Sequence, residues 1–383
     1  MISKAWKMSA SVIIAQRLPV VRDSLKTVGS ACRPSKTNHS FPECSNLHIM
    51  SLRRGESDRH LPGIHVFPGG HLDEADTSPD WIYLYKSLGF EESSFVDLST
   101  GGGIECHPEY QDMGSACLPG WMSLRLCAIR ETFEECGILL CRNPSSIEQG
   151  LPYASFVIVN ELSAWQNRVR ADPRQMLALC HTAGCVPDVW GLHLWSNWLT
   201  PTQQKVRHNS TVFLAVLRSL PTYSINLSEM DELKCCSAYD LINLAHSGNV
   251  RLANPQFYEA VRLTNFADAD ALSSFAYNRA QLGCQQIMPV QEKTRNGMLF
   301  IFPGDSAYPK IVDCETPRNL VKREQSLEEL SERVKASSGT LHRLEVPTSG
   351  PCQRIITHNY IPPFKHILPS IAHGRWNGTK SHL

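Results

Sequence analysis

The alternation of apolar and polar positions predicts short strands joined by longer connections. Strand-sized apolar runs occur at Ser9–Ala15, Leu47–Leu52 and Thr211–Leu217. The segment Leu18–Pro42 is rich in Pro, Ser, Arg and Lys and lacks either periodicity, which predicts a loop. No apolar run reaches the roughly 18 residues of a membrane helix, so we expect no membrane span.

A helical pattern dominates the segment 121–140. Leu126, Ile129 and Phe133 recur three and four positions apart, so they face the same side of a helix and are expected to point inward. Gly137 is expected to end the helix in the left-handed conformation, and the apolar residues 138–140 are expected to leave it as a strand.

The other side of this helix carries Glu131, Glu134 and Glu135, which crowd three carboxylates onto one surface. Three neighbouring anions repel one another unless a cation lies between them. All-oxygen ligands suit a hard divalent ion, so we expect Mg²⁺ or Mn²⁺ here. The competing interpretation is a solvated acidic helix face.

Two segments resemble the halves of the Nudix signature. Residues 130–138, Arg-Glu-Thr-Phe-Glu-Glu-Cys-Gly-Ile, match the helical half, with Thr132 at a position that is usually apolar. Residues 67–76, which include Gly69 and Gly70, resemble the preceding loop, with Asp76 in place of the usual Glu. The resemblance implies an α/β fold: the Nudix α/β/α sandwich with a mixed sheet.

The two halves are unusually far apart in the chain. The uninterrupted motif has seven residues where 53 separate Asp76 from Arg130, so 46 are extra. An insertion at 77–120 is tolerable only if its ends return close together. This layout is similar to that of a Nudix subfamily of peroxisomal acyl-coenzyme A diphosphatases. The inserted segment is expected either to cap the substrate cleft or to be plain surface elaboration.

The resemblance assigns roles to the charged residues of the box. Glu131 and Glu135 would hold metal ions, Glu134 would be a further ligand or the base, and Arg130 would fix the carboxylates by a salt bridge. The implied reaction is hydrolysis of coenzyme A or acyl-coenzyme A to 3',5'-ADP and (acyl) 4'-phosphopantetheine. Two alternatives stay open: another substrate such as ADP-ribose or NADH, and a nucleotide-binding module without catalysis.

Three arginines precede the glycine loop, and the surrounding pattern partly resembles that of coenzyme-A-type Nudix enzymes. Arg53, Arg54 and Arg59 could bind the phosphates of coenzyme A, because a guanidinium forms paired bonds with phosphate oxygens. Gly69 and Gly70 would let the backbone bring the acidic loop against the helix. The alternative for the arginines is a solvated basic loop.

The rest of the chain supplies weaker signals. Two helices are expected between Asn143 and Leu179, and another begins near Leu252. Glu229, Asp231 and Glu232 could supplement the metal cluster or be surface acids before a helix. We place a Nudix domain at 1–290 and a C-terminal extension at 291–380. The extension is expected to contain strands at Leu299–Phe302, Leu344–Val346 and Arg354–Ile356 and a charged helix at Arg323–Arg333.

Composition limits the classes of partner. The 37 basic and 37 acidic residues balance, which argues against nucleic-acid binding. The 14 cysteines include no Cys-x2-Cys pair, and Cys180-x4-Cys185 and Cys235-Cys236 lack a second half. We therefore expect reduced thiols, many of them packed in the core, rather than a zinc site. We expect a monomer.

The two ends carry possible addresses. Ser381-His382-Leu383 resembles the Ser-Lys-Leu peroxisomal signal, which implies an import receptor as partner. Residues 1–22 have four basic residues and no acid, as in a mitochondrial transit peptide. The strand-like run Ser9–Ala15 lies in this segment and argues against a transit peptide. We therefore expect the peroxisome, and the mitochondrion remains the alternative.

Overall fold

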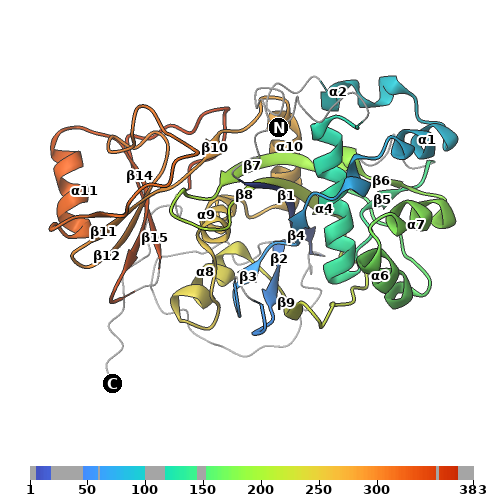
Figure 1. Cartoon of the computed structure of the whole chain (residues 1–383), viewed down its shortest axis with the longest axis horizontal. Coiled ribbons are helices and arrows are strands. Elements are labelled where there is room, and N and C mark those ends of the chain that lie inside the picture. Colours follow the sequence, from blue (N-terminus) through green and yellow to red (C-terminus); the bar gives the residue numbers. More distant parts are fainter. Residues whose placement is uncertain are drawn as a thin grey trace, which may run out of the picture.

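An eight-stranded mixed sheet lies at the centre of the protein (Figure 1). The computed structural model describes residues 6–18, 46–58, 61–99, 117–144, 152–350 and 353–369. The strand order is β10 (Gln286–Ile287), β7 (His193–Leu199), β8 (His208–Leu217), β1 (Lys7–Arg17), β2 (Leu47–Arg54) and β3 (His65–Val66); β4 (Gly69–His71) also pairs with β1, and β9 (Met230–Cys236) with β2. Strand β1 runs parallel to β8 and antiparallel to β2 and β4.

Strand β1 is apolar on both faces, which places it between two cores. Ala10, Val12 and Ile14 point to one core, whereas Ile13 and Ala15 point to the other. β-branched residues suit such a doubly covered strand. The apolar pattern on both faces of β1 therefore indicates a central strand that is covered by a layer on each face.

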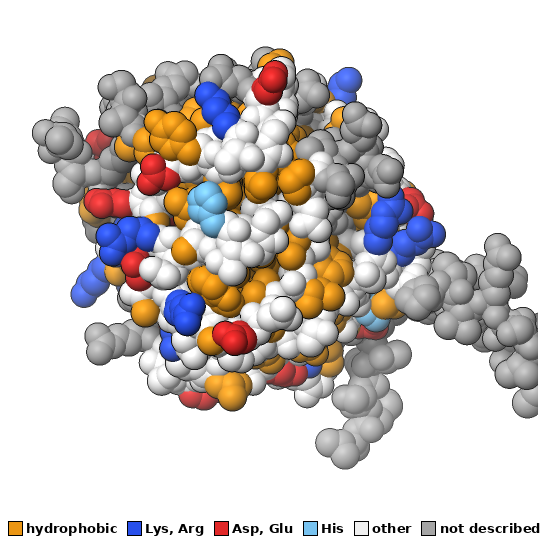
Figure 2. All heavy atoms as spheres, turned by 90° about the vertical axis from the view of Figure 1, so that its right-hand side faces the viewer, with side chains coloured by type: hydrophobic (Ala, Val, Ile, Leu, Met, Phe, Trp, Pro, Cys, Tyr) orange, Lys and Arg blue, Asp and Glu red, His pale blue; other side chains and the backbone are white. Residues whose placement is uncertain are grey.

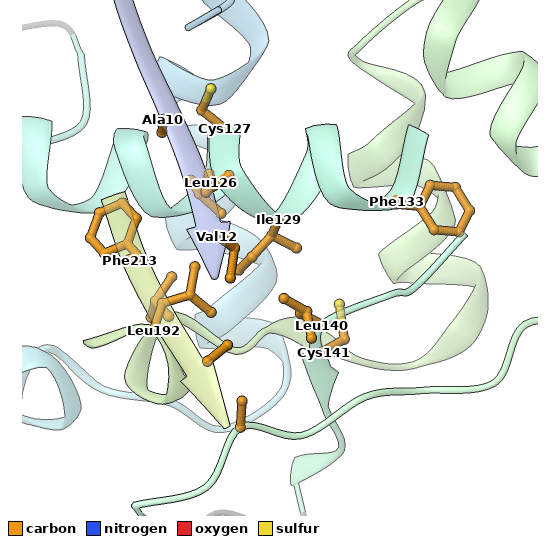
Figure 3. Close-up of a cluster of buried hydrophobic side chains, with 14 of the residues drawn as sticks. Ala10, Val12, Leu126, Cys127, Ile129, Phe133, Leu140, Cys141, Leu192 and Phe213 are labelled. Atoms are coloured by element: carbon orange, nitrogen blue, oxygen red, sulfur yellow. The ribbon is translucent and has the colours of Figure 1, made fainter. Parts of the chain in front are cut away.

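Helices cover each face of the sheet (Figure 1). The first layer holds α4 (Gly120–Cys136), α6 (Leu162–Ala171), α7 (Gln175–Ala183) and α1 (Asp80–Ser87), with a small two-stranded antiparallel sheet of β5 (Cys141–Arg142) and β6 (Val186–Pro187). The second layer holds α8 (Ala238–His246), α9 (Asn254–Leu263) and α10 (Ala269–Ala280). Figure 3 shows the first core, where Leu126 and Ile129 of α4 lie beside Val12 of β1.

A second sheet forms the C-terminal part. Its order is β13 (Val321–Lys322), β11 (Val290–Thr294), β12 (Gly297–Ile301), β14 (Leu341–Pro347) and β15 (Arg354–His358), and α11 (Leu327–Ala336) packs on it. Phe302 and Leu344 belong to the same core as α9, so this sheet packs on the second helical layer. The domain boundary at residue 290 stays a prediction.

Most predicted elements are confirmed. The strands at 9–15, 47–52 and 211–217 are present, and α4 ends at Gly137 with φ 73°. The sequence analysis missed β7, β9 and α10. Asp231 and Glu232 lie on β9, and α8 begins shortly after that strand, at Ala238.

Several predictions fall outside the described residues: the loop Leu18–Pro42 beyond Leu18, Arg59, part of the insertion, and the tripeptide Ser381-His382-Leu383. Two further elements of the insertion are described, the 3₁₀ turn η2 (Glu92–Phe95) and α2 (Val96–Ser99). Among the described helices, none has the length and apolarity needed to cross a membrane.

Candidate active site

The two halves of the Nudix signature meet in space despite the insertion. The amide of Leu118 donates a hydrogen bond of 2.9 Å to the carbonyl of Thr77, so the two ends of the insertion lie side by side. The 3₁₀ turn η1 (Glu74–Thr77) begins with a capping box in which Asp76 accepts from the backbone amide of Asp73. This turn holds Asp76 against α4.

Arg130 joins the two halves. Its Nε and Nη2 donate to the two carboxylate oxygens of Asp76 at 2.8 and 2.9 Å, and Nη2 also donates to the carbonyl of His71 at 2.9 Å. Its Nη1 donates to Glu131 at 2.9 Å and to Glu134 at 2.8 Å. Such paired, charge-assisted bonds fix geometry as well as charge. The guanidinium therefore holds two glutamates of the cluster in place.

Two glycines let the loop approach the helix. A Cβ on Gly70 would lie 2.4 Å from the carboxylate of Glu131, and a Cβ on Gly69 would lie 2.3 Å from the carbonyl oxygen of Ala10 in β1. Gly69 also has φ 153°, and its amide donates to Glu135 Oε2 at 2.9 Å. The backbone of Gly69 thus positions one glutamate, and the missing side chain of Gly70 leaves room for another.

Burial raises the pKa of all three glutamates. For Glu131 the pKa rises to about 7, mainly by burial, with Glu134 adding to the rise and Arg130 opposing it. Burial likewise raises the pKa of Glu134, and it raises that of Glu135 well above the ordinary value, with repulsion from Glu131 as the next cause. Carboxylates in this state are stabilised by an added cation.

The three carboxylates are close but not gathered around one point. Glu131 and Glu134 turn to Arg130, whereas Glu135 turns to the Gly69 amide. Within the described ranges, the one set of three or more potential ligands whose atoms all lie within 4.8 Å is formed by cysteines. The assignment of Glu131, Glu134 and Glu135 as metal ligands stays a prediction, one that the donor chemistry fits.

The predicted phosphate-binding arginines differ in their salt-bridge and hydrogen-bond partners. Arg53 pairs with Asp231 at 2.8 Å and also with Glu56. Arg54 pairs with Asp58 at 2.9 Å, and its charge lowers the pKa of Glu135. Its buried Nε has no hydrogen-bond partner among the described residues. Of Arg53 and Arg54, Arg54 therefore has an unused hydrogen-bond donor near the carboxylates.

Further residues lie around the site. The sequence analysis did not assign His71, which follows Gly70, or His208; His71 Nε2 and His208 Nδ1 are 3.0 Å apart. Glu229, which the sequence analysis offered as a supplement to the metal cluster, is exposed, and its charge adds to the raised pKa of Glu134 and Glu135. The pairing of His71 with His208 needed the β4–β1–β8 arrangement.

Local hydrogen bonding explains why Thr132 can stand at a position of the motif that is usually apolar. Thr132 is fully buried, and its hydroxyl donates to the carbonyl of Ala128 at 2.7 Å. The hydroxyl is thus satisfied within the helix itself, so threonine can occupy a position that is usually apolar.

Comparisons with known proteins agree with this arrangement. The family model "NUDT19 Nudix domain" matches residues 6–263. The Homo sapiens protein "Acyl-coenzyme A diphosphatase NUDT19" is 30% identical over 99% of this chain and 97% of its own length. A Gallus gallus protein of the same name is 31% identical over 95% and 94%.

A solved structure, "Crystal structure of NUDIX hydrolase from Alicyclobacillus acidocaldarius", matches 70% of this chain and 96% of its own with a TM-score of 0.47 and 18% identity. The family assignment rests on the family model and the full-length relatives. Both extend across the insertion and both halves of the box. The chain therefore belongs to the Nudix family, in the branch defined by the NUDT19 Nudix domain.

Proposed function

We propose that this protein hydrolyses the diphosphate bond of coenzyme A and acyl-coenzyme A, giving 3',5'-ADP and (acyl) 4'-phosphopantetheine. The observation that carries the proposal is the joined Nudix box, in which Arg130 connects Asp76 to the carboxylates of α4. The substrate follows from the full-length relatives, which are named acyl-coenzyme A diphosphatases.

The charge of the site supports a divalent cation, Mg²⁺ or Mn²⁺. Arg130 binds Asp76, Glu131 and Glu134, and Glu135 accepts a hydrogen bond from the Gly69 amide, so the one guanidinium offsets one of four negative charges. Burial makes this excess costly, as the raised pKa values show. Carboxylate oxygens are the ligands that these hard ions prefer.

The residues of the chain then divide the work. When bound, a divalent cation neutralises the diphosphate and makes a bound water more acidic. Glu131 and Glu135 would hold it, and Glu134, whose pKa is raised by burial, would accept a proton from the attacking water. Arg130 keeps Glu131 and Glu134 oriented and does not itself touch the substrate.

Arg54 is the residue that we propose for contact with a substrate phosphate. Its Nε points to no partner among the described residues, and it lies close enough to Glu135 to lower that group's pKa. Arg53 is held by two acids and would have to exchange one of them for a phosphate oxygen. We further propose residence in the peroxisome, on the basis of the Ser381-His382-Leu383 sequence.

Hydrolysis in water labelled with heavy oxygen tests the proposal. Mass spectrometry should find the label in one of two phosphate-bearing products, 3',5'-ADP or 4'-phosphopantetheine, and turnover should require added Mg²⁺ or Mn²⁺. The substitution Glu135→Gln should abolish turnover. Faster turnover of ADP-ribose than of coenzyme A would contradict the substrate, and unchanged turnover by Glu135→Gln would contradict the ligand assignment.

A further inference from the structure

Three buried cysteines meet beside the first helical layer, away from the carboxylates. Cys141, Cys180 and Cys185 are each 0% exposed, and their sulfur atoms all lie within 4.8 Å of one another. The Sγ atoms of Cys141 and Cys180 are 3.9 Å apart. Figure 3 shows Cys141 at the edge of the core, next to Leu140, and Figure 2 shows the outer surface of this side of the molecule, where apolar side chains gather between charged ones.

Local structure explains why Cys180 and Cys185 lie close together. Helix α7 ends in a Schellman turn: the amide of Cys185 donates to the carbonyl of Cys180 at 3.1 Å, and Gly184 has φ 61° and donates to His181. This turn commonly carries an apolar contact between the positions that Cys180 and Cys185 occupy. Packing alone thus accounts for this pair.

The third sulfur comes from another element. Cys141 lies on β5, opposite Pro187 of β6, and this pairing brings its side chain to the end of α7. Nothing in the turn requires sulfur at that place, since an apolar side chain would also fill it. Sulfur atoms from β5 and from the end of α7 therefore lie within 4.8 Å of one another.

We propose that Cys141, Cys180 and Cys185 bind a thiophilic metal ion, and that this ion is Zn²⁺. Zinc binds thiolate sulfur at about 2.3 Å, so the sulfurs of a tetrahedral site are about 3.8 Å apart. The Cys141–Cys180 separation of 3.9 Å already fits that triangle. Soft sulfur ligands select zinc over the hard ions that suit the glutamates of α4, so the two sites take different metals.

A buried aromatic side chain lies beside the three sulfurs. The side chain of Tyr85 in α1 is buried beside the cluster, since charges on all three thiols contribute to its raised pKa after burial itself. Its hydroxyl donates to the carbonyl of Pro187 at 2.7 Å. A metal held here would join α7, β5 and β6 directly beneath the insertion, which makes its role structural. Because the site is closed, the ion would enter as the chain folds.

The test begins with the full-length protein purified without metal-affinity tags. Elemental analysis should find about one zinc per chain. Refolding with Co²⁺ in place of Zn²⁺ should give the intense near-ultraviolet absorption of thiolate-to-cobalt charge transfer, which carboxylate ligands do not produce. Glu135→Gln should keep this absorption, so failure of the proposed hydrolysis and failure of the zinc site can be told apart.

The variants Cys180→Ser and Cys141→Ser should each weaken Zn²⁺ binding by about a hundredfold or more, because each removes a ligand. Cys284 is another buried cysteine and lies outside the cluster, so Cys284→Ser should leave Zn²⁺ binding unchanged. Protein without stoichiometric zinc that also refolds with Co²⁺ without the charge-transfer band would overturn the proposal. So would a Cys141–Cys180 disulfide in the native protein. The wild-type measurements stand even if a variant fails to fold.

Discussion

The substitution Gly70→Ala separates the positioning of Glu131 from the stability of the fold. The added Cβ would lie 2.4 Å from the Glu131 carboxylate, whereas ordinary contact begins at 3.4 Å, so the carboxylate must retreat by about 1 Å. A displacement of about 1 Å at a reacting centre costs about 100-fold in rate. That loss corresponds to about 2.7 kcal/mol of transition-state stabilisation.

The fold itself should tolerate the change. Gly70 is not among the glycines with positive φ, and the atoms in its way belong to the flexible end of a side chain. We expect the free energy of unfolding to change by no more than about 1 kcal/mol, the usual range for glycine to alanine at a compatible position. Urea denaturation in Mg²⁺ and release of 3',5'-ADP from coenzyme A measure the two effects.

A double-mutant cycle decides whether the loss acts through Glu131. If Gly70→Ala only displaces this carboxylate, adding it to Glu131→Gln should reduce turnover little further. Fully additive losses, or a wild-type rate in Gly70→Ala alone, would refute the reasoning.

Three other outcomes are expected. Asp76→Asn removes the paired, charge-assisted bonds to Arg130 but leaves it bound to Glu131 and Glu134, so the free energy of unfolding should fall by about 1–3 kcal/mol in urea titration. Burial raises the pKa of Glu131 from 4.5 to about 7. The folded protein then binds more protons than the unfolded chain between these values, so with chelator present its stability should fall as pH rises from 4.5 to 7. Residues 371–383 fused to the end of a fluorescent protein should direct it to peroxisomes.

Each outcome has a control. Asp76→Glu should retain more stability than Asp76→Asn, because it keeps the charge that Arg130 binds. Glu131→Gln should flatten the pH dependence, as should excess Mg²⁺, and a slope unchanged by both would contradict the assignment. A fluorescent fusion that carries the same tail without Ser381-His382-Leu383 should stay diffuse, and diffuse fluorescence with the tripeptide present would contradict the address.

Local sequence was sufficient to predict the central elements of the fold. The doubly apolar run of β1 and the three- and four-residue spacing in α4 were visible without any long-range information. Strand β9 was hidden because Asp231, Glu232 and Lys234 interrupt its pattern. These charges are accommodated by pairing across strands, for example Asp231 with Arg53 at 2.8 Å, which no local window reveals.

The sequence predicts the residues of the candidate site, but it could not predict their arrangement. Motif spacing identified Arg130 and the three glutamates, yet it could not show that Glu135 turns to the Gly69 amide while Glu131 and Glu134 share Arg130. The cysteine cluster was likewise invisible. Cys141 is 39 residues from Cys180, and only the β5–β6 pairing brings them together.

The hydrogen bond between Leu118 and Thr77 joins the two ends of the insertion, so the backbone could be closed after the segment is removed. Its side chains argue otherwise, because Leu84, Tyr85 and Phe90 fill the interior, and the indole of Trp190 stacks on Phe90 and Phe95. Excision would restore the short spacing of the uninterrupted motif, but it would also remove side chains from the core and leave a cavity there. The inserted segment therefore supplies part of the core against which α4 packs.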